Sequence, residues 1–163
     1  MDWSRYRFHS RWDLDAPPDE VYAELAAPEG YPLWWPQVRE ANRTGADRGT
    51  LRVRSLIPYD LTVTLDGAHE DPEARVLWIA LHGDLEGWAR WTVRDRGVGS
   101  LAVFDQDVVV RKALLRRLSV PGRPFFRANH ALMMRAGRRG LRARLAAAGA
   151  DRGPARGRGP YAV

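Results

Sequence analysis

The sequence has no cysteine, and only one of its 26 basic residues, Lys112, is a lysine. Without cysteine the chain can form no disulfide framework, no thiolate nucleophile and no cysteine-ligated zinc or iron–sulfur centre. The longest apolar runs, such as Val76–Leu81, are far too short to cross a bilayer. The first residues, MDWSRYRF, lack the apolar core of a secretory signal peptide. We therefore expect a cytoplasmic protein.

Motifs that carry known chemistry are also missing. The sequence contains no HExxH, P-loop, GxSxG or GxGxxG pattern. No pair of carboxylates falls on a strand face that is predicted to point inward. The histidines at positions 9, 69, 82 and 130 do not have the spacing of metal ligands. We expect no metal site and no cofactor.

Charge is distributed unevenly along the chain. Residues 1–110 carry 12 basic and 19 acidic side chains, whereas residues 111–163 carry 14 basic side chains and a single acidic one, Asp151. One interpretation is that a long helix exposes an arginine-rich face while the rest of the surface is acidic. The other is that the basic end binds nucleic acid or an anionic membrane surface.

The N-terminal pattern predicts a strand followed by a short helix. Tyr6, Phe8 and Trp12 occupy even positions and alternate with arginines, which is typical of a half-buried strand. Pro17 and Pro18 then suit the first turn of a helix, and the acidic residues after them favour its positively polarised end. Proline and glycine near residue 30 end this helix.

A run of strands and one long helix complete the predicted fold. Six strands are expected at 38–44, 50–57, 59–70, 75–82, 86–95 and 99–110, and the loops between them are too short for a crossover helix. Residues 124–148 form an amphipathic helix with one apolar and one arginine-rich side. We predict an α+β domain over residues 1–148, with about seven antiparallel strands in β-α-β6-α order. Residues 149–163 are rich in Gly, Pro and Arg, which predicts a disordered basic tail.

Three stretches of this sequence resemble one family. They are PPDEVYAELAAPEGYPLWWPQVRE, GDLEGWARWTV at Gly83–Val93 and RPFFRANHALMMRAGRRGLRARL at Arg123–Leu145. Together they are similar to the polyketide cyclase/dehydrase-like branch of the START-like (SRPBCC, helix-grip) superfamily. The resemblance implies a curved sheet that grips the last helix and an elongated apolar cavity between the two. It specifies function poorly, because the superfamily includes aromatases, cyclases and binders of lipids and hormones.

The stretch EGYPLWWPQVR places Tyr31, Trp34 and Trp35 between two prolines. Rings this large and this close together are not buried by local packing alone, so we expect them to close one end of the space between sheet and helix as a lid. The alternative is that they fill the core without any ligand. Stacking on nucleic acid is disfavoured, because Glu29 and Glu40 flank the rings.

Alternation on the last two strands selects residues that face the cavity. Arg90 and Arg94 share one face, so Ala89 and Trp91 should point inward. On the next strand the inward set includes Gln106, whose amide either binds a ligand or satisfies a neighbouring polar group.

His130 lies at the centre of the apolar side of the last helix. A buried histidine can be a purely structural hydrogen-bonded residue, or it can act as an acid/base group or an anchor for a ligand. It is the one candidate catalytic residue.

Both faces of the strand 75–82 are apolar, so periodicity does not decide whether Trp78 and His82 point inward. The candidate ligand-binding residues are Trp35, Tyr59, Trp78, His82, Trp91, Phe104, Gln106, Phe126, Asn129 and Met133.

These observations leave three functional hypotheses. The first is a cavity that binds a hydrophobic small molecule, such as a polyketide, a fatty acyl compound or another lipid-like molecule. The second is an aromatase/cyclase or dehydratase that uses the same cavity, shapes a flexible substrate and supplies one acid/base group. The third is a nucleic-acid or anionic-membrane binder that uses the basic helix face and tail.

Overall fold

The computed structural model describes residues 4–54, 60–113, 117 and 122–153. In chain order the described elements are β1 (Arg5–Leu14), α1 (Pro18–Leu25), the 3-10 helix η1 (Pro28–Leu33), β2 (Val38–Arg43), β3 (Gly49–Arg54), β4 (Asp60–Asp71), β5 (Val76–Gly83), β6 (Leu85–Asp95), β7 (Ser100–Val110) and α3 (Arg123–Asp151).

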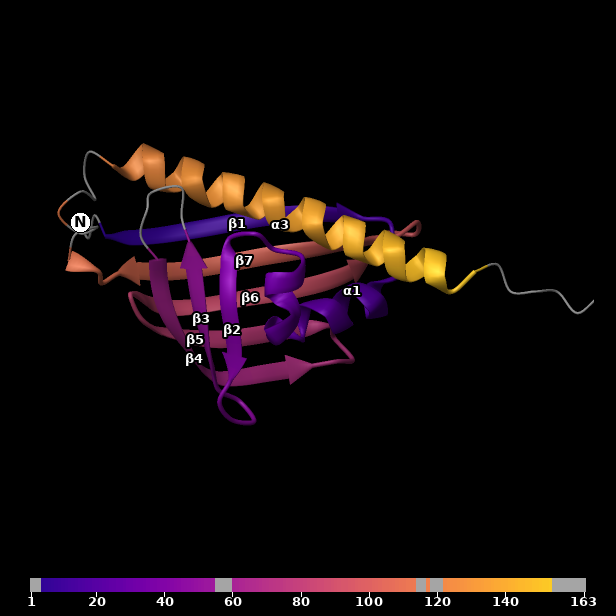
Figure 1. Ribbon diagram of the computed structural model, residues 1–163, viewed down its shortest axis with the longest axis horizontal. Coiled ribbons are helices and arrows are strands. Elements are labelled where there is room, and N and C mark those ends of the chain that lie inside the picture. The colour runs from indigo at the N-terminus through magenta and orange to yellow at the C-terminus, as the bar shows by residue number, and fades with distance from the viewer. Residues whose placement is uncertain (1–3, 55–59, 114–116, 118–121, 154–163) are drawn as a thin grey trace, which may run out of the picture.

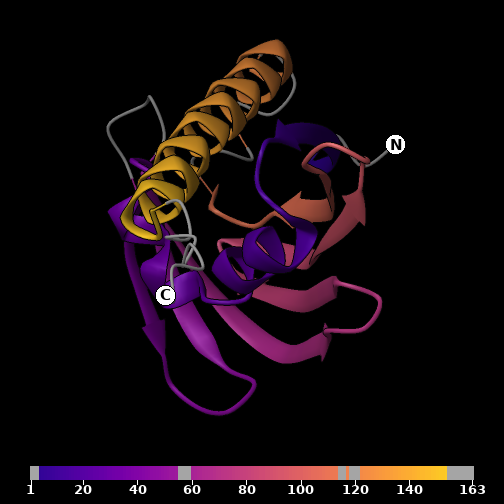
Figure 2. The same ribbon diagram turned by 90° about the vertical axis from the view of Figure 1, so that its right-hand side faces the viewer.

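The strands form one antiparallel sheet in the order β1-β7-β6-β5-β4-β3-β2. Strands β2 to β7 are neighbours in sequence order, and β1 pairs with β7 along its whole length (Figure 1). Figure 2 shows the strands curving beneath α3, with α1 near one end of the helix. The predicted α+β arrangement, a sheet of seven antiparallel strands with a long final helix, is confirmed.

Element boundaries differ slightly from those predicted. Helix α3 continues to Asp151, three residues beyond the expected end of the domain at Ala148. Just after it, Arg152 forms a bidentate ion pair with Glu20 in α1, with its closer contact at 2.5 Å. Residues 55–59, predicted as the end of one strand and the start of the next, lie outside the described residues.

The two sides of the sheet differ as the alternation predicts. On the concave side Trp12, Trp91 and Val108 are buried. On the outer side, basic residues are neutralised by carboxylates on neighbouring strands: Arg5 lies 2.8 Å from Asp107, and Arg90 lies 2.9 Å from Asp105. The sheet therefore has an apolar inner face and a charge-balanced outer face.

The aromatic turn after α1 is one of the places where α3 packs on the rest of the molecule. The Trp35 indole Nε1 donates a hydrogen bond to the Met133 carbonyl oxygen of α3 at 3.0 Å. A Cβ atom on Gly137 would lie 2.5 Å from the Trp35 ring, and one on Gly140 would lie 1.6 Å from the Trp34 carbonyl oxygen. Glycine at these two helix positions allows a closer approach than any other residue would. Trp35 thus bonds to the helix backbone, and the Trp34 backbone lies close against the helix at Gly140.

Candidate functional site

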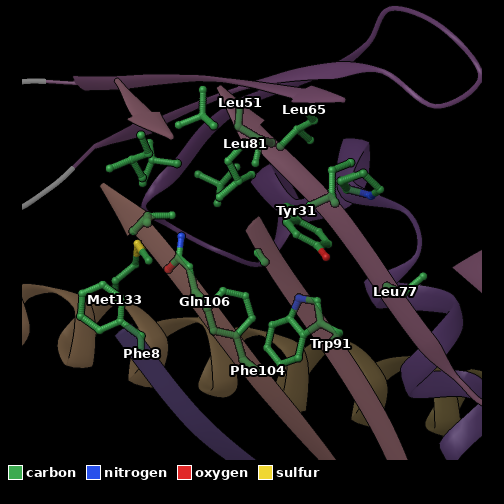
Figure 3. A pocket seen from close by; sticks show the side chains of 18 of the residues that line it. Phe8, Tyr31, Leu51, Leu65, Leu77, Leu81, Trp91, Phe104, Gln106 and Met133 are labelled. Atoms are coloured by element: carbon green, nitrogen blue, oxygen red, sulfur yellow. The ribbon is translucent and has the colours of Figure 1, made fainter. Parts of the chain in front are cut away.

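A cavity of about 270 Å³ lies between the concave face of the sheet and α3. This volume is close to the lower end of the range for small-molecule pockets, about 300–1,000 Å³. Figure 3 shows aliphatic side chains from β3, β4 and β5 on one side, including Leu51, Leu65 and Leu81. Aromatic rings from β6 and β7, Trp91 and Phe104, lie on the other. The wall is almost entirely apolar, so the cavity suits a hydrophobic molecule.

Most of the sequence-predicted site residues are brought together at this cavity. The lining residues from the predicted set are Trp35, Trp78, Trp91, Phe104, Gln106, Phe126, Asn129, His130 and Met133. Tyr31, in the predicted lid, also lines the cavity, and its hydroxyl donates a hydrogen bond of 2.6 Å to the Leu25 carbonyl oxygen. Burial raises the pKa of Tyr31, against the opposing effect of a hydrogen bond from Trp91. This hydroxyl is therefore neutral and already has a partner.

Strand β5 turns Leu77, Ile79 and Leu81 toward the cavity. His82 therefore lies on the opposite face of the strand, where it is exposed and its Nδ1 atom lies 3.1 Å from a Glu86 carboxylate oxygen. The structure does not bring His82 to the cavity, because the inward positions of β5 are the odd-numbered ones. Trp78 is at the margin, with 37% of its surface exposed. Tyr59 lies outside the described residues.

Several lining residues were not singled out from the sequence. The aliphatic wall includes Val53 and Leu61 in addition to the leucines shown in Figure 3, and Tyr6 and Phe8 of β1 line the end under the start of α3. The alternation of these strands does identify their apolar face. Alternation does not show which part of that face packs tightly and which part borders a void, since this depends on how far α3 stands from the sheet.

His130 is held by stacking and by one hydrogen bond. Its ring lies parallel to Phe8, with 3.7 Å between the ring centroids, and its Nε2 atom lies 3.3 Å from the Gln106 Oε1 atom. Phe8 and Gln106 face each other across the β1–β7 pair. Burial lowers the pKa of His130 to about 4. At neutral pH the ring is therefore uncharged, donates Nε2–H to Gln106 and leaves Nδ1 as a hydrogen-bond acceptor.

The buried imidazole predicts a loss of stability in mildly acidic solution. The pKa of His130 is about 4 in the folded protein against 6.5 for the free group, so the unfolded state binds more protons between these values and stability falls as the pH decreases through this window. The free energy of unfolding should drop by about 2 kcal/mol between pH 7.5 and pH 5. H130Q should lose about 2 kcal/mol less over the same interval in denaturant titrations. An identical pH dependence in the two proteins would contradict this assignment.

The cavity offers no site for a metal ion in the part of the chain that the structure describes, where no cluster of three His, Asp or Glu side chains occurs. Within the same residues, no helix is long and apolar enough to cross a membrane. The described lining itself offers an apolar surface and hydrogen-bonding groups from Gln106, His130 and their neighbours.

Comparisons with known proteins agree with this geometry. Residues 5–148 match the family model described as "Polyketide cyclase / dehydrase and lipid transport". No curated protein sequence matches the chain significantly.

Solved structures from diverse organisms share the fold. The Zhui aromatase/cyclase from Streptomyces sp. R1128 superimposes with a TM-score of 0.72 at 18% identity, covering 94% of this chain and 98% of its own. A START superfamily protein from Mycobacterium smegmatis superimposes with a TM-score of 0.67 at 15% sequence identity. The match covers 85% of this chain and 96% of the other. The major latex-like protein 151 of Panax ginseng superimposes with a TM-score of 0.65 at 9% sequence identity. The match covers 86% of this chain and 97% of the other. The chain therefore has the helix-grip fold of START-like proteins.

Proposed function

Since the chain belongs to the polyketide cyclase / dehydrase and lipid transport family, we propose that it binds a hydrophobic small molecule, of polyketide-, lipid- or acyl-like character, in the cavity beneath α3. The observation that carries this proposal is the cavity itself. Protein interiors are normally packed with few voids larger than a water molecule, yet about 270 Å³ stays open here among large aromatic side chains. The same space would be filled by ordinary packing if it had only a structural role.

Binding of a neutral apolar dye tests the proposal. N-phenyl-1-naphthylamine fluoresces strongly in apolar surroundings, and Trp35 and Trp91 in the cavity wall provide a second, intrinsic signal. We expect saturable binding of one dye molecule per chain, with a change in tryptophan fluorescence at the same dye concentrations. Absence of saturable binding to the folded protein would refute a ligand-binding cavity.

A cyclase or dehydratase reaction in the same cavity is the second candidate. The observation in its favour is a neutral imidazole, His130, that lines the cavity and keeps Nδ1 available as a proton acceptor. Its low pKa makes the ring a weak base that is not protonated at neutral pH, so it suits hydrogen bonding better than proton donation. If a substrate is found, H130Q should lower kcat by about 100-fold for an acid/base role and should leave kcat unchanged for a purely structural one.

Binding of an anionic partner through α3 is a third candidate. Arg135 and Arg139 lie on the exposed side of this helix and form no ion pair with any residue that the structure describes. On the outer sheet face, in contrast, Arg5 and Arg90 are neutralised by carboxylates. An unpaired basic helix face favours an anionic surface, but it says nothing about the cavity. For that reason we place it behind ligand binding.

A further inference from the structure

The polar groups of the cavity are gathered mainly at one end. Gln106 and His130 lie where β7 and α3 meet β1, and Figure 3 shows the Gln106 amide directed into the cavity. Tyr6 belongs to the same end, because it pairs with Val108, two residues after Gln106 on β7. Elsewhere the described lining adds the Tyr31 hydroxyl, which is already bonded to the Leu25 carbonyl oxygen, and the exposed residues His69 and Glu70. A ligand would therefore meet an apolar wall along most of its length and buried polar groups at one terminus.

The Tyr6 hydroxyl is the unusual member of this group. Tyr6 lines the cavity and is 2% exposed, yet its hydroxyl oxygen has no hydrogen-bond partner among the residues that the structure describes. Buried hydroxyls are nearly always paired, because leaving one unpaired sacrifices its hydrogen bonds with water. Phenylalanine would fill the same place without this cost. The hydroxyl oxygen itself has almost no accessible surface, so a ligand oxygen takes up this donor only after a small shift of the rings beside it.

The Tyr6 ring is held firmly in place. It lies parallel to Phe8 with 5.9 Å between centroids, and Phe8 in turn stacks on His130. Phe126 of α3 meets the Tyr6 ring edge-on, with centroids 6.0 Å apart. With these rings on two sides, the hydroxyl has a defined position. Little side-chain entropy is therefore lost when a ligand atom bonds to it.

The surroundings of this hydroxyl are positively charged. The Arg123 guanidinium lies 5.2 Å from the centre of the Tyr6 ring. Burial raises the pKa of Tyr6, and the positive charges of Arg123 and Arg127 act in the opposite direction, which places both cations within electrostatic reach of the phenol. Helix α3 carries no acidic residue before Asp151. A negatively charged or strongly polarised oxygen is therefore favoured at this end.

We propose that the Tyr6 end of the cavity binds the carboxylate of an acyl-chain ligand, with the Tyr6 hydroxyl donating a hydrogen bond to it and the chain lying along the aliphatic wall. This inference rests on the proposed function and names the ligand class of the same site. The arginines beside Tyr6 favour the charged oxygen, and the largely apolar wall favours an apolar chain over a polar one.

The test compares two tyrosine variants, Y6F and Y22F. Tyr22 is a matched control, because its hydroxyl is also buried and has no partner within the described part of the chain, but the residue does not line the cavity. The probes are dodecanoate, methyl dodecanoate and the dye N-phenyl-1-naphthylamine, which offers no carbonyl oxygen. Affinities for the first two are measured by displacement of the dye, and the dye itself by direct titration.

We expect Y6F to weaken dodecanoate binding by about 10-fold or more, since a hydrogen bond to a charged group is lost. Dye affinity should stay unchanged in Y6F, and its melting temperature should stay the same or rise, because an unpaired buried hydroxyl is removed. Y22F should resemble the wild type with every probe. Wild-type protein should bind dodecanoate more tightly than its methyl ester, and equal affinities would overturn the carboxylate assignment.

Two outcomes separate this inference from the proposed function. If the dye and dodecanoate bind but Y6F and Y22F behave alike toward dodecanoate, the Tyr6 site is wrong while the binding cavity stands. If neither probe binds the wild-type protein, the proposed function fails and the inference fails with it.

Discussion

Replacing Gly140 with alanine should lower the free energy of unfolding by about 3 kcal/mol, although alanine is the better helix former by about 1 kcal/mol. The added Cβ atom would lie 1.6 Å from the Trp34 carbonyl oxygen and 2.7 Å from its carbonyl carbon. Because both are backbone atoms, no side-chain rotation can relieve the clash, and α3 must move away from the aromatic turn. For a domain of this size we expect a drop in melting temperature of roughly 10 °C.

Gly149 supplies the matched control for this change. It lies in the same helix, and a Cβ atom there would meet no atom within 4 Å. G149A should therefore raise stability by up to about 1 kcal/mol. Similar effects of the two substitutions in thermal unfolding would mean that α3 does not rest on the tryptophan turn as described.

Replacing Ala89 with phenylalanine should abolish ligand binding while the fold persists. Ala89 lies in the middle of β6, between Ile79 of β5 and Gln106 of β7, and lines the cavity. A benzyl side chain there would occupy the volume that a ligand needs, so dye affinity should fall by at least about 100-fold. Because the new ring fills an existing void, stability should stay the same or rise by about 1 kcal/mol.

The same ring added to the other face of the sheet is the control. Ala80 on β5 is partly buried but does not line the cavity. A80F should therefore leave dye affinity within about 2-fold of the wild type, well below the tenfold step that corresponds to about 1.4 kcal/mol. If A89F and A80F both retained wild-type affinity, the dye would be binding elsewhere on the protein.

The sequence predicts the fold well because the fold depends on alternation and on helical periodicity. Arginines on one face of β6 place Ala89 and Trp91 on the other, and both are buried. The same reasoning does not decide which face of β5 points inward, because both faces of that strand are apolar. Only the structure shows that Leu77 points inward and that His82 is exposed and paired with a carboxylate.

The site was harder to predict, because it depends on distances between elements that are remote in sequence. His130 was recognised from its place on the apolar side of α3. Its partner Gln106 is 24 positions away and its stacking partner Phe8 is far more distant, so neither contact follows from a local pattern. The aromatic turn was expected to act as a lid. In the structure Trp35 also anchors α3 through a hydrogen bond to the helix backbone, a role that no spacing rule reveals.

Titration of dodecanoate into protein with ¹³C-labelled methyl groups tests the central claim most directly. Methyl groups of Leu51, Val63 and Leu81 lie in the cavity wall, whereas those of Leu14 and Leu141 are fully buried but do not line it. We predict progressive, saturable shifts of the first group, with the second group unchanged. Shifts confined to exposed methyl groups, or spread equally over both buried groups, would contradict a ligand bound between the sheet and α3.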